Sequence, residues 1–304
     1  MATVALVHGI AQEQRSADAL EAEWVPALAG GIRNAGFHDL ADSLWRHQRP
    51  GALEVRMAFY GNEFIKQGSQ GIDGAPPFDL DESLIDELAA EWLNNALESS
   101  NPRDAGNAEM ELAALNARGE SQGIMRGASL LANGLDRIPW MTRGGLAVAG
   151  RFNKALTQVG AYLSSPVLRS KILSRVSAVI DDDTKVVVSH SLGSVVAYEV
   201  LRDRSIPIPL FITLGSPLAL RAVRSRLQFE PKYPAVKNWI NLVDPDDVVA
   251  ARPNIQNFFN LARPSGSKFD STYTVDNGAS PHDARFYLGK EPVAVSVSGV
   301  LVGS

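Results

Sequence analysis

Ser191 has the surroundings of a possible nucleophile, within the stretch TKVVVSHSLGSVVAYE at residues 184–199. A β-branched run precedes it and a helical pattern follows it, which predicts that the serine lies on a tight turn between a strand and a helix. Ser189 and Gly193 are small enough to let that strand and helix approach closely, although glycine would fit position 189 more easily. The alternative is a helix N-terminus that is rich in capping serines.

A serine hydroxyl is a weak nucleophile at neutral pH until a neighbouring base accepts its proton, so the rest of the chain must supply that base. The five histidines of the chain are His8, His38, His47, His190 and His282. His190 directly precedes Ser191. We expect its ring to point away from the serine, because successive residues of an extended chain face opposite sides.

Three aspartates could supply the group that orients such a base. Asp244, Asp246 and Asp247 follow an apolar run in NWINLVDPDDVVAAR. Chemistry alone does not choose among them, and turn formation beside proline is a common use of aspartate. A metal site is a further alternative, but no fourth ligand is apparent and hard cations need oxygen-rich shells.

The composition limits the classes of function. The chain has 304 residues, a net charge of −5 and no cysteine. Disulfides, thiolate nucleophiles and cysteine-ligated metals are therefore excluded, and a general nucleic-acid-binding surface is disfavoured. The start, MATVALVHGI, lacks the basic region of a signal peptide, and no apolar run reaches the roughly 18 residues of a membrane span. We expect a soluble, cytoplasmic protein.

The elements that would position these residues alternate along the chain. Apolar runs predict strands at 3–9, 53–61, 184–190, 208–217 and 235–244. Helical patterns cover 16–36, with Ser16 as the N-cap, and 194–203, whereas 293–302 fits either a strand or the last helix. This alternation predicts the α/β class, with a mostly parallel central sheet flanked by helices.

Residues 62–183 interrupt the alternation with about 120 residues of helical pattern, clearest at 79–100. We expect a core formed by residues 1–61 and 184–304, and a helical cap formed by 62–183 over the carboxyl ends of the strands, where such sheets bind ligands. Ordinary packing against the sheet edge is the alternative. Trp92 and Trp140 could give this insertion a transient contact with a lipid surface, although core packing is the simpler use.

Five segments together resemble the α/β-hydrolase superfamily, on its lipase and esterase side. They are LVHGI, VVVSHSLGS, ITLGSPL, NLVDPDDVVA and SPHDARFYL, and they occur in the family's order. The resemblance spans nearly the whole chain outside the insertion, and Ser189 is its one departure from the usual glycine. It implies the α/β-hydrolase fold, with a nucleophile elbow at Ser191 and a structural turn at Gly215-Ser216-Pro217.

The family's chain order of serine, acid and histidine assigns the remaining roles. It implies His282 as the base, because this histidine alone lies far downstream of Ser191. Asp247, followed by Val248-Val249-Ala250, resembles the family's acid most closely, with Asp244 as the runner-up. The backbone N–H groups of Leu192 and Ile10 would form the oxyanion hole.

The resemblance implies a serine hydrolase that cleaves a carboxylic ester through an acyl-enzyme, with a small acyl ester or lipid-like molecule as substrate. No metal or organic cofactor is expected, and no nucleic acid. A thioesterase, acyltransferase or cyclase would use the same three side chains, and a peptidase or membrane-acting phospholipase is also compatible. A binding protein on a hydrolase scaffold is the alternative from another class.

Overall fold

A computed structural model describes residues 2–46, 53–65, 81–100, 102–119, 151–202, 204–250 and 254–303. Its centre is a six-stranded sheet in the order β2-β1-β3-β4-β5-β6, and every neighbouring pair is parallel. The strands are β1 (Val4–Val7), β2 (Val55–Ala58), β3 (Val186–His190), β4 (Ile208–Leu214), β5 (Val236–Val243) and β6 (Lys268–Thr274). The predicted α/β class with a parallel sheet is confirmed.

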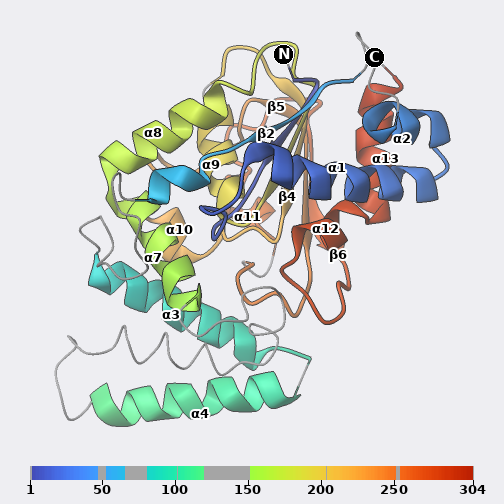
Figure 1. Ribbon diagram of the computed structural model, residues 1–304. Coiled ribbons are helices and arrows are strands. Elements are labelled where there is room, and N and C mark those ends of the chain that lie inside the picture. The colour runs from blue at the N-terminus through green and yellow to red at the C-terminus, as the bar shows by residue number, and fades with distance from the viewer. Residues whose placement is uncertain are drawn as a thin grey trace.

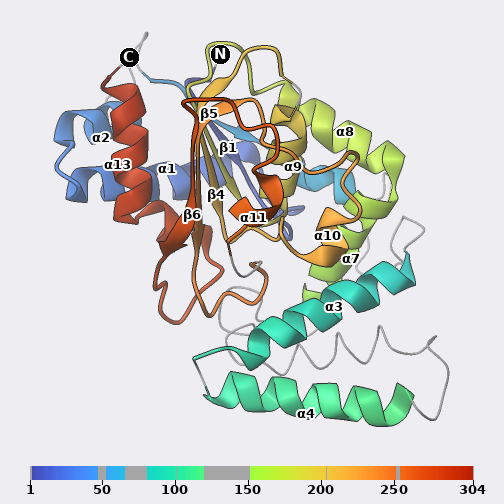
Figure 2. The same cartoon turned by 180° about the vertical axis from the view of Figure 1, so that it is seen from behind.

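Helices cover both faces of this sheet (Figures 1 and 2). One face carries α1 (Ala17–Asn34), α2 (His38–Trp45), α12 (Ala284–Leu288) and α13 (Glu291–Leu301). The other carries α3 (Glu82–Leu97), α7 (Arg151–Ser164), α8 (Pro166–Ser177) and α9 (Leu192–Leu201). The shorter helices are η1 (Gly61–Phe64), α10 (Arg221–Arg224) and α11 (Gln256–Phe259), and α4 (Pro102–Gly119) packs against α3.

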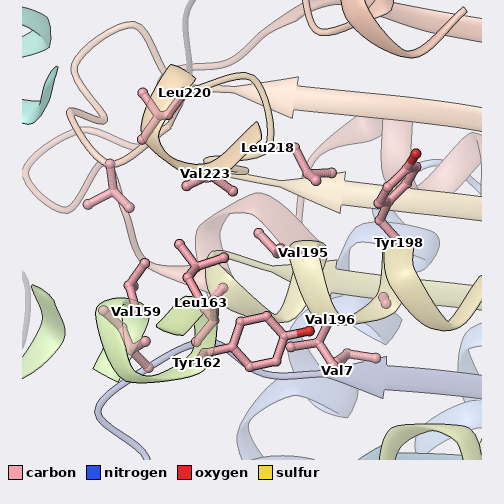
Figure 3. Close-up of a cluster of buried hydrophobic side chains, with 14 of the residues drawn as sticks. Val7, Val159, Tyr162, Leu163, Val195, Val196, Tyr198, Leu218, Leu220 and Val223 are labelled. Carbon is pink, nitrogen blue, oxygen red and sulfur yellow. The ribbon is translucent and has the colours of Figure 1, made fainter. Parts of the chain in front are cut away.

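The two helical layers explain why the central strands are apolar throughout. Successive residues of β1 alternate between two hydrophobic clusters: Val4 and Leu6 face α1, whereas Ala5 and Val7 face the layer of α7 and α9. Figure 3 shows this second cluster, in which Val7 lies near Tyr162 and Val196. A strand buried on both faces has no polar side to display, so it gives a continuous hydrophobic run.

Most of the predicted elements are present, with shorter bounds. Ser16 is the N-cap of α1, and its Oγ accepts a hydrogen bond from the Ala19 N–H at 3.2 Å. The ambiguous segment 293–302 lies mainly within the helix α13. β6 is absent from the strands predicted from the sequence, and its polar segment KFDSTYT forms the sheet edge after β5.

The predicted insertion at 62–183 contributes α3, α4, α7 and α8, whereas residues 66–80 and 120–150 lie outside the described residues. Asp81 caps α3, and its carboxylate accepts hydrogen bonds from the Ser83 and Leu84 N–H groups. Trp92 is completely buried in the core, so its ring does not reach a lipid surface, and Trp140 lies in the undescribed part. Within the described helices, none has the length and apolar character needed to cross a membrane.

Gly193 allows α9 to start directly against the end of β1. A β-carbon at this position would lie 2.3 Å from the His8 carbonyl oxygen and 2.5 Å from that of Val7, and both of these are backbone atoms that cannot move aside cheaply. The close approach of helix and strand therefore requires glycine here.

We predict that Gly193→Ala lowers the free energy of unfolding by about 1–3 kcal/mol or more, because the added methyl group overpacks the core. Gly299→Ala is the matched control, since Gly299 lies on the exposed side of α13 with nothing within 4 Å of the added carbon. This control should raise stability by about 0.5–1 kcal/mol. Urea unfolding measures both, and equal effects of the two substitutions would contradict the packing assigned to Gly193.

Candidate active site

Ser191 lies on the turn between β3 and α9 in an unusual backbone conformation. Its φ is 54° and its ψ is −133°, a region that residues with a side chain rarely occupy. The Ser191 N–H donates to the Leu214 carbonyl at 3.0 Å, and the Ser191 carbonyl accepts from the Ser194 N–H at 2.9 Å and its hydroxyl at 2.6 Å. These contacts hold the turn on both sides of the serine.

Two small neighbours fit the turn to its surroundings. Ser189 is buried, and its hydroxyl donates to the Ile212 carbonyl on β4 at 3.0 Å, so it fills the small-residue position with its polar group satisfied. Gly9 follows β1 and passes directly beside the nucleophile candidate. A β-carbon on Gly9 would lie 2.7 Å from the Ser191 β-carbon. Any residue larger than glycine would therefore clash with Ser191 at this position.

The structure brings Ser191, His282 and Asp247 into one line of hydrogen bonds. The distance from Ser191 Oγ to His282 Nε2 is 3.0 Å, and that from His282 Nδ1 to Asp247 Oδ2 is 2.8 Å. A proton on Nδ1 that is directed at the carboxylate leaves Nε2 free to accept the proton of the serine. His282 lies on the loop before α12, and Asp247 on the loop after β5.

Asp247 is completely buried, but four groups bind its carboxylate. Oδ1 accepts from the N–H groups of Val249 and Ala250 at 3.1 and 3.3 Å, and Oδ2 accepts from His282 and from the Tyr287 hydroxyl, the latter at 2.9 Å. Both oxygens of this buried carboxylate therefore have hydrogen-bond partners, as buried polar groups require.

Tyr287 is a site residue that was not predicted from the sequence. Its hydroxyl donates to Asp247 and accepts the Asp244 N–H at 2.8 Å, so it joins the two ends of the aspartate loop. Burial, followed by the neighbouring Asp247 charge, raises the pKa of Tyr287 well above its usual value, which keeps the hydroxyl a donor. An aromatic residue on the helix after His282 was the only sequence signal.

Each of the three aspartates binds a different set of groups. Asp244 accepts the N–H groups of Asn277 and Asp246, and burial raises the pKa of its carboxyl group. Asp246 accepts from Ser99 and Ser100 at the end of α3. Across the described residues, no three side chains of histidine or carboxylate type converge as a metal site would require.

Gly215 lies against the pair formed by His282 and Asp247. Its φ is +52°, and a β-carbon there would lie 2.6 Å from Asp247 Oδ2 and 3.2 Å from His282 Nδ1. From the sequence, Gly215-Ser216-Pro217 is predicted to be a structural turn. The glycine is also what leaves room for the carboxylate to reach the imidazole.

The loop after β1 is organised by His8, which is completely buried. Its Nδ1 hydrogen donates to the Gly9 carbonyl at 2.7 Å, and its Nε2 accepts the Tyr60 N–H at 3.1 Å, which fixes the neutral ring in one tautomer. Among the described contacts, neither the Ile10 N–H nor the Leu192 N–H donates to a protein acceptor. Leu192 is the first residue of α9, where N–H groups have no partner within the helix.

His190 lies close to His282. Its ring centroid is 4.5 Å from that of His282, and the residue lines the same cavity as Ser191. The ring also lies beside Trp24 of α1 and Tyr287 of α12, on the sheet face that alternation along β3 predicts for it. Burial, reinforced by repulsion from His282, lowers the pKa of His190 well below its usual value, so its ring is neutral at pH 7.

A cavity of about 520 Å³ opens at Ser191 and His282 and has walls of two kinds. Apolar side chains from the insertion and adjacent loops form part of it, namely Ile10, Trp92, Ala155 and Val249. Paired charges form another part, with Arg15 bound to Glu23 and Arg285 bound to Asp283. The site therefore offers both apolar and polar surface beside the serine hydroxyl.

We predict that His8 makes stability depend on pH. Burial lowers its pKa from 6.5 to about 4. Between these values the unfolded chain binds more protons than the folded one, so the contribution of His8 is complete above pH 6.5 and is lost as the pH falls towards 4. The free energy of unfolding should therefore fall by about 1 kcal/mol per pH unit in this window through His8 alone.

Urea unfolding at several pH values between 4 and 7 measures this slope. His8→Asn, which does not titrate, should show a shallower slope than the unchanged chain. His190 adds a dependence of the same sign, because its pKa is also lowered. Identical slopes for the two proteins would contradict the buried, neutral His8.

The chain was compared with family models, with curated proteins and with solved structures. No family model, no curated protein and no solved structure matches the chain.

Proposed function

We propose that the protein is a serine hydrolase of the α/β-hydrolase superfamily that cleaves a carboxylic ester through an acyl-enzyme on Ser191. The observation that carries the proposal is the hydrogen-bonded line from Ser191 Oγ through His282 to Asp247, with distances of 3.0 and 2.8 Å. Serine, imidazole and carboxylate in this order form the arrangement that activates a hydroxyl for acyl transfer. The strained turn at Ser191 supports the same assignment, since such strain gathers at functional sites.

In the proposed reaction, His282 Nε2 accepts the hydroxyl proton as Ser191 Oγ attacks the ester carbonyl. Asp247 holds the imidazole in the required tautomer and stabilises its cation. The oxyanion would be bound by the Ile10 and Leu192 N–H groups. When the tetrahedral intermediate collapses, His282 returns the proton to the departing alcohol, and water then cleaves the acyl-enzyme with the same base.

The predicted cap belongs to this proposal. Trp92 of α3 and Ala155 of α7 come from the insertion and line the cavity beside Ser191, which supports a division into a core of residues 1–61 and 184–304 and a cap of residues 62–183. The apolar wall suits the acyl part of an ester, and no bound metal or organic cofactor takes part in the steps above. Partition of the acyl-enzyme between water and added alcohols or amines separates a hydrolase from an acyltransferase.

We predict that an active-site-directed fluorophosphonate labels the protein at Ser191, because the serine is activated and the oxyanion donors fit the phosphonyl oxygen. Ser191→Ala should abolish both this labelling and the hydrolysis of p-nitrophenyl esters. Ser43→Ala is the control, since the Ser43 hydroxyl donates to the Asp39 carbonyl within α2 and its removal leaves Ser191 and its turn unchanged. Undiminished labelling of Ser191→Ala would exclude Ser191 as the nucleophile.

The choice between Asp247 and Asp244 is tested by paired amides. Asp247→Asn should lower kcat by about 10⁴-fold, because the amide favours the wrong imidazole tautomer. Asp244→Asn should cost far less, since Asp244 accepts the backbone N–H groups of Asp246 and Asn277 and has no described hydrogen bond to His282. Steady-state ester hydrolysis measures both variants, and a larger loss in Asp244→Asn would reverse the assignment.

A further inference from the structure

The loop that follows β1 has a conformation that its own sequence does not enforce. Ala11 has a φ of 60°, in the left-handed region that residues with a β-carbon seldom adopt. The neighbouring residue, Ile10, lines the cavity beside Ser191. Contacts from outside the loop must therefore keep the backbone in this conformation.

One such contact comes from the insertion, more than 140 residues away along the chain. Gln158 of α7 accepts the Ala11 N–H through Oε1 at 2.8 Å and donates through Nε2 to Glu13 Oε2 at 2.9 Å. Both side chains are buried, with Gln158 only 4% exposed. The two partners fix the orientation of the amide, because the N–H needs an oxygen and the carboxylate needs an NH₂ group.

The side chains around this loop immobilise two successive peptide units. In the unit that joins Ile10 to Ala11, Gln158 binds the N–H, and the Gln12 side chain donates to the Ile10 carbonyl at 3.2 Å. In the preceding unit, His8 binds the Gly9 carbonyl at 2.7 Å. The remaining group of that unit is the Ile10 N–H, for which the described contacts contain no protein acceptor.

We infer that Gln158 is a positioning residue for the oxyanion hole, by which the insertion sets the direction of the Ile10 N–H. This inference rests on the proposed serine hydrolase activity. It gives the insertion a role in the chemistry besides covering the cavity. A donor acts on the transition state only when it is aimed at the position of the oxyanion, so a small rotation of this peptide would lower kcat more than it alters substrate binding.

The test begins with Gln158→Met, which removes both hydrogen bonds at similar volume. We expect kcat for a p-nitrophenyl ester to fall about 10- to 100-fold with little change in KM, somewhat less than the loss of a whole oxyanion donor. The inhibition constant of a trifluoromethyl ketone, whose adduct with Ser191 carries an oxyanion, should rise by the same factor. Thr157→Val is the control on the same helix, and we expect it to leave all three quantities unchanged.

A reciprocal exchange provides the rescue. Gln158→Glu alone sets a second carboxylate against Glu13 and should be impaired at pH 8. In the double variant with Glu13→Gln, the new carboxylate at 158 can accept both the Ala11 N–H and the new amide at position 13. This restores both contacts with the donor direction of the second reversed. The double variant should regain most of the kcat and inhibitor affinity lost by Gln158→Glu.

The outcomes separate the inference from the proposed function. If the wild-type protein is active and Gln158→Met keeps the same kcat and inhibitor affinity, the inference is overturned and the proposed hydrolase function stands. The inference would also be overturned if the loss of kcat equalled the unfolded fraction measured by circular dichroism and the double variant recovered no kcat. A wild-type protein without Ser191-dependent ester hydrolysis would refute the proposed function, and the inference with it.

Discussion

Ser191 combines a φ of 54° with a ψ of −133°, and a side chain held in such a region costs on the order of 1–3 kcal/mol. The fold must supply this energy through its other contacts. The turn is fixed by hydrogen bonds to β4 and α9, and glycines at positions 9 and 193 let β1 pass within contact of it. The rest of the site depends on this constraint, because it raises the hydroxyl out of the strand direction and towards His282.

The other groups of the site come from loops that require support from both helical layers. Tyr287 of α12, on one face of the sheet, binds Asp247 and the Asp244 N–H. From the other face, Asn95 of α3 donates to the Val248 and Ala250 carbonyls at 2.9 and 3.1 Å, and Gln158 of α7 holds the loop after β1. Packing of the two layers against the sheet therefore sets the geometry of the polar groups at its edge.

Features that depend on a local residue pattern could be predicted from the sequence. The apolar strands follow from burial on both faces, and the small residues around Ser191 follow from the crossing of strand and helix. The edge strand β6 has no such signal, because its sequence is largely polar and only two of its seven residues are buried. The contact of the His190 ring with His282, the contact of Gly215 with the aspartate and the role of Tyr287 all arise from segments that meet only in the folded chain, so no local sequence pattern predicts them.

The central claim is that Ser191 carries a covalent acyl group during turnover, and rapid-quench kinetics with a p-nitrophenyl ester test it most directly. The account predicts a burst of one equivalent of nitrophenolate per protein, with the acyl mass on Ser191 in the tryptic peptide 186–202. Linear release without a burst, together with no acylated peptide after acid quenching, or an acyl group on another residue, would contradict it.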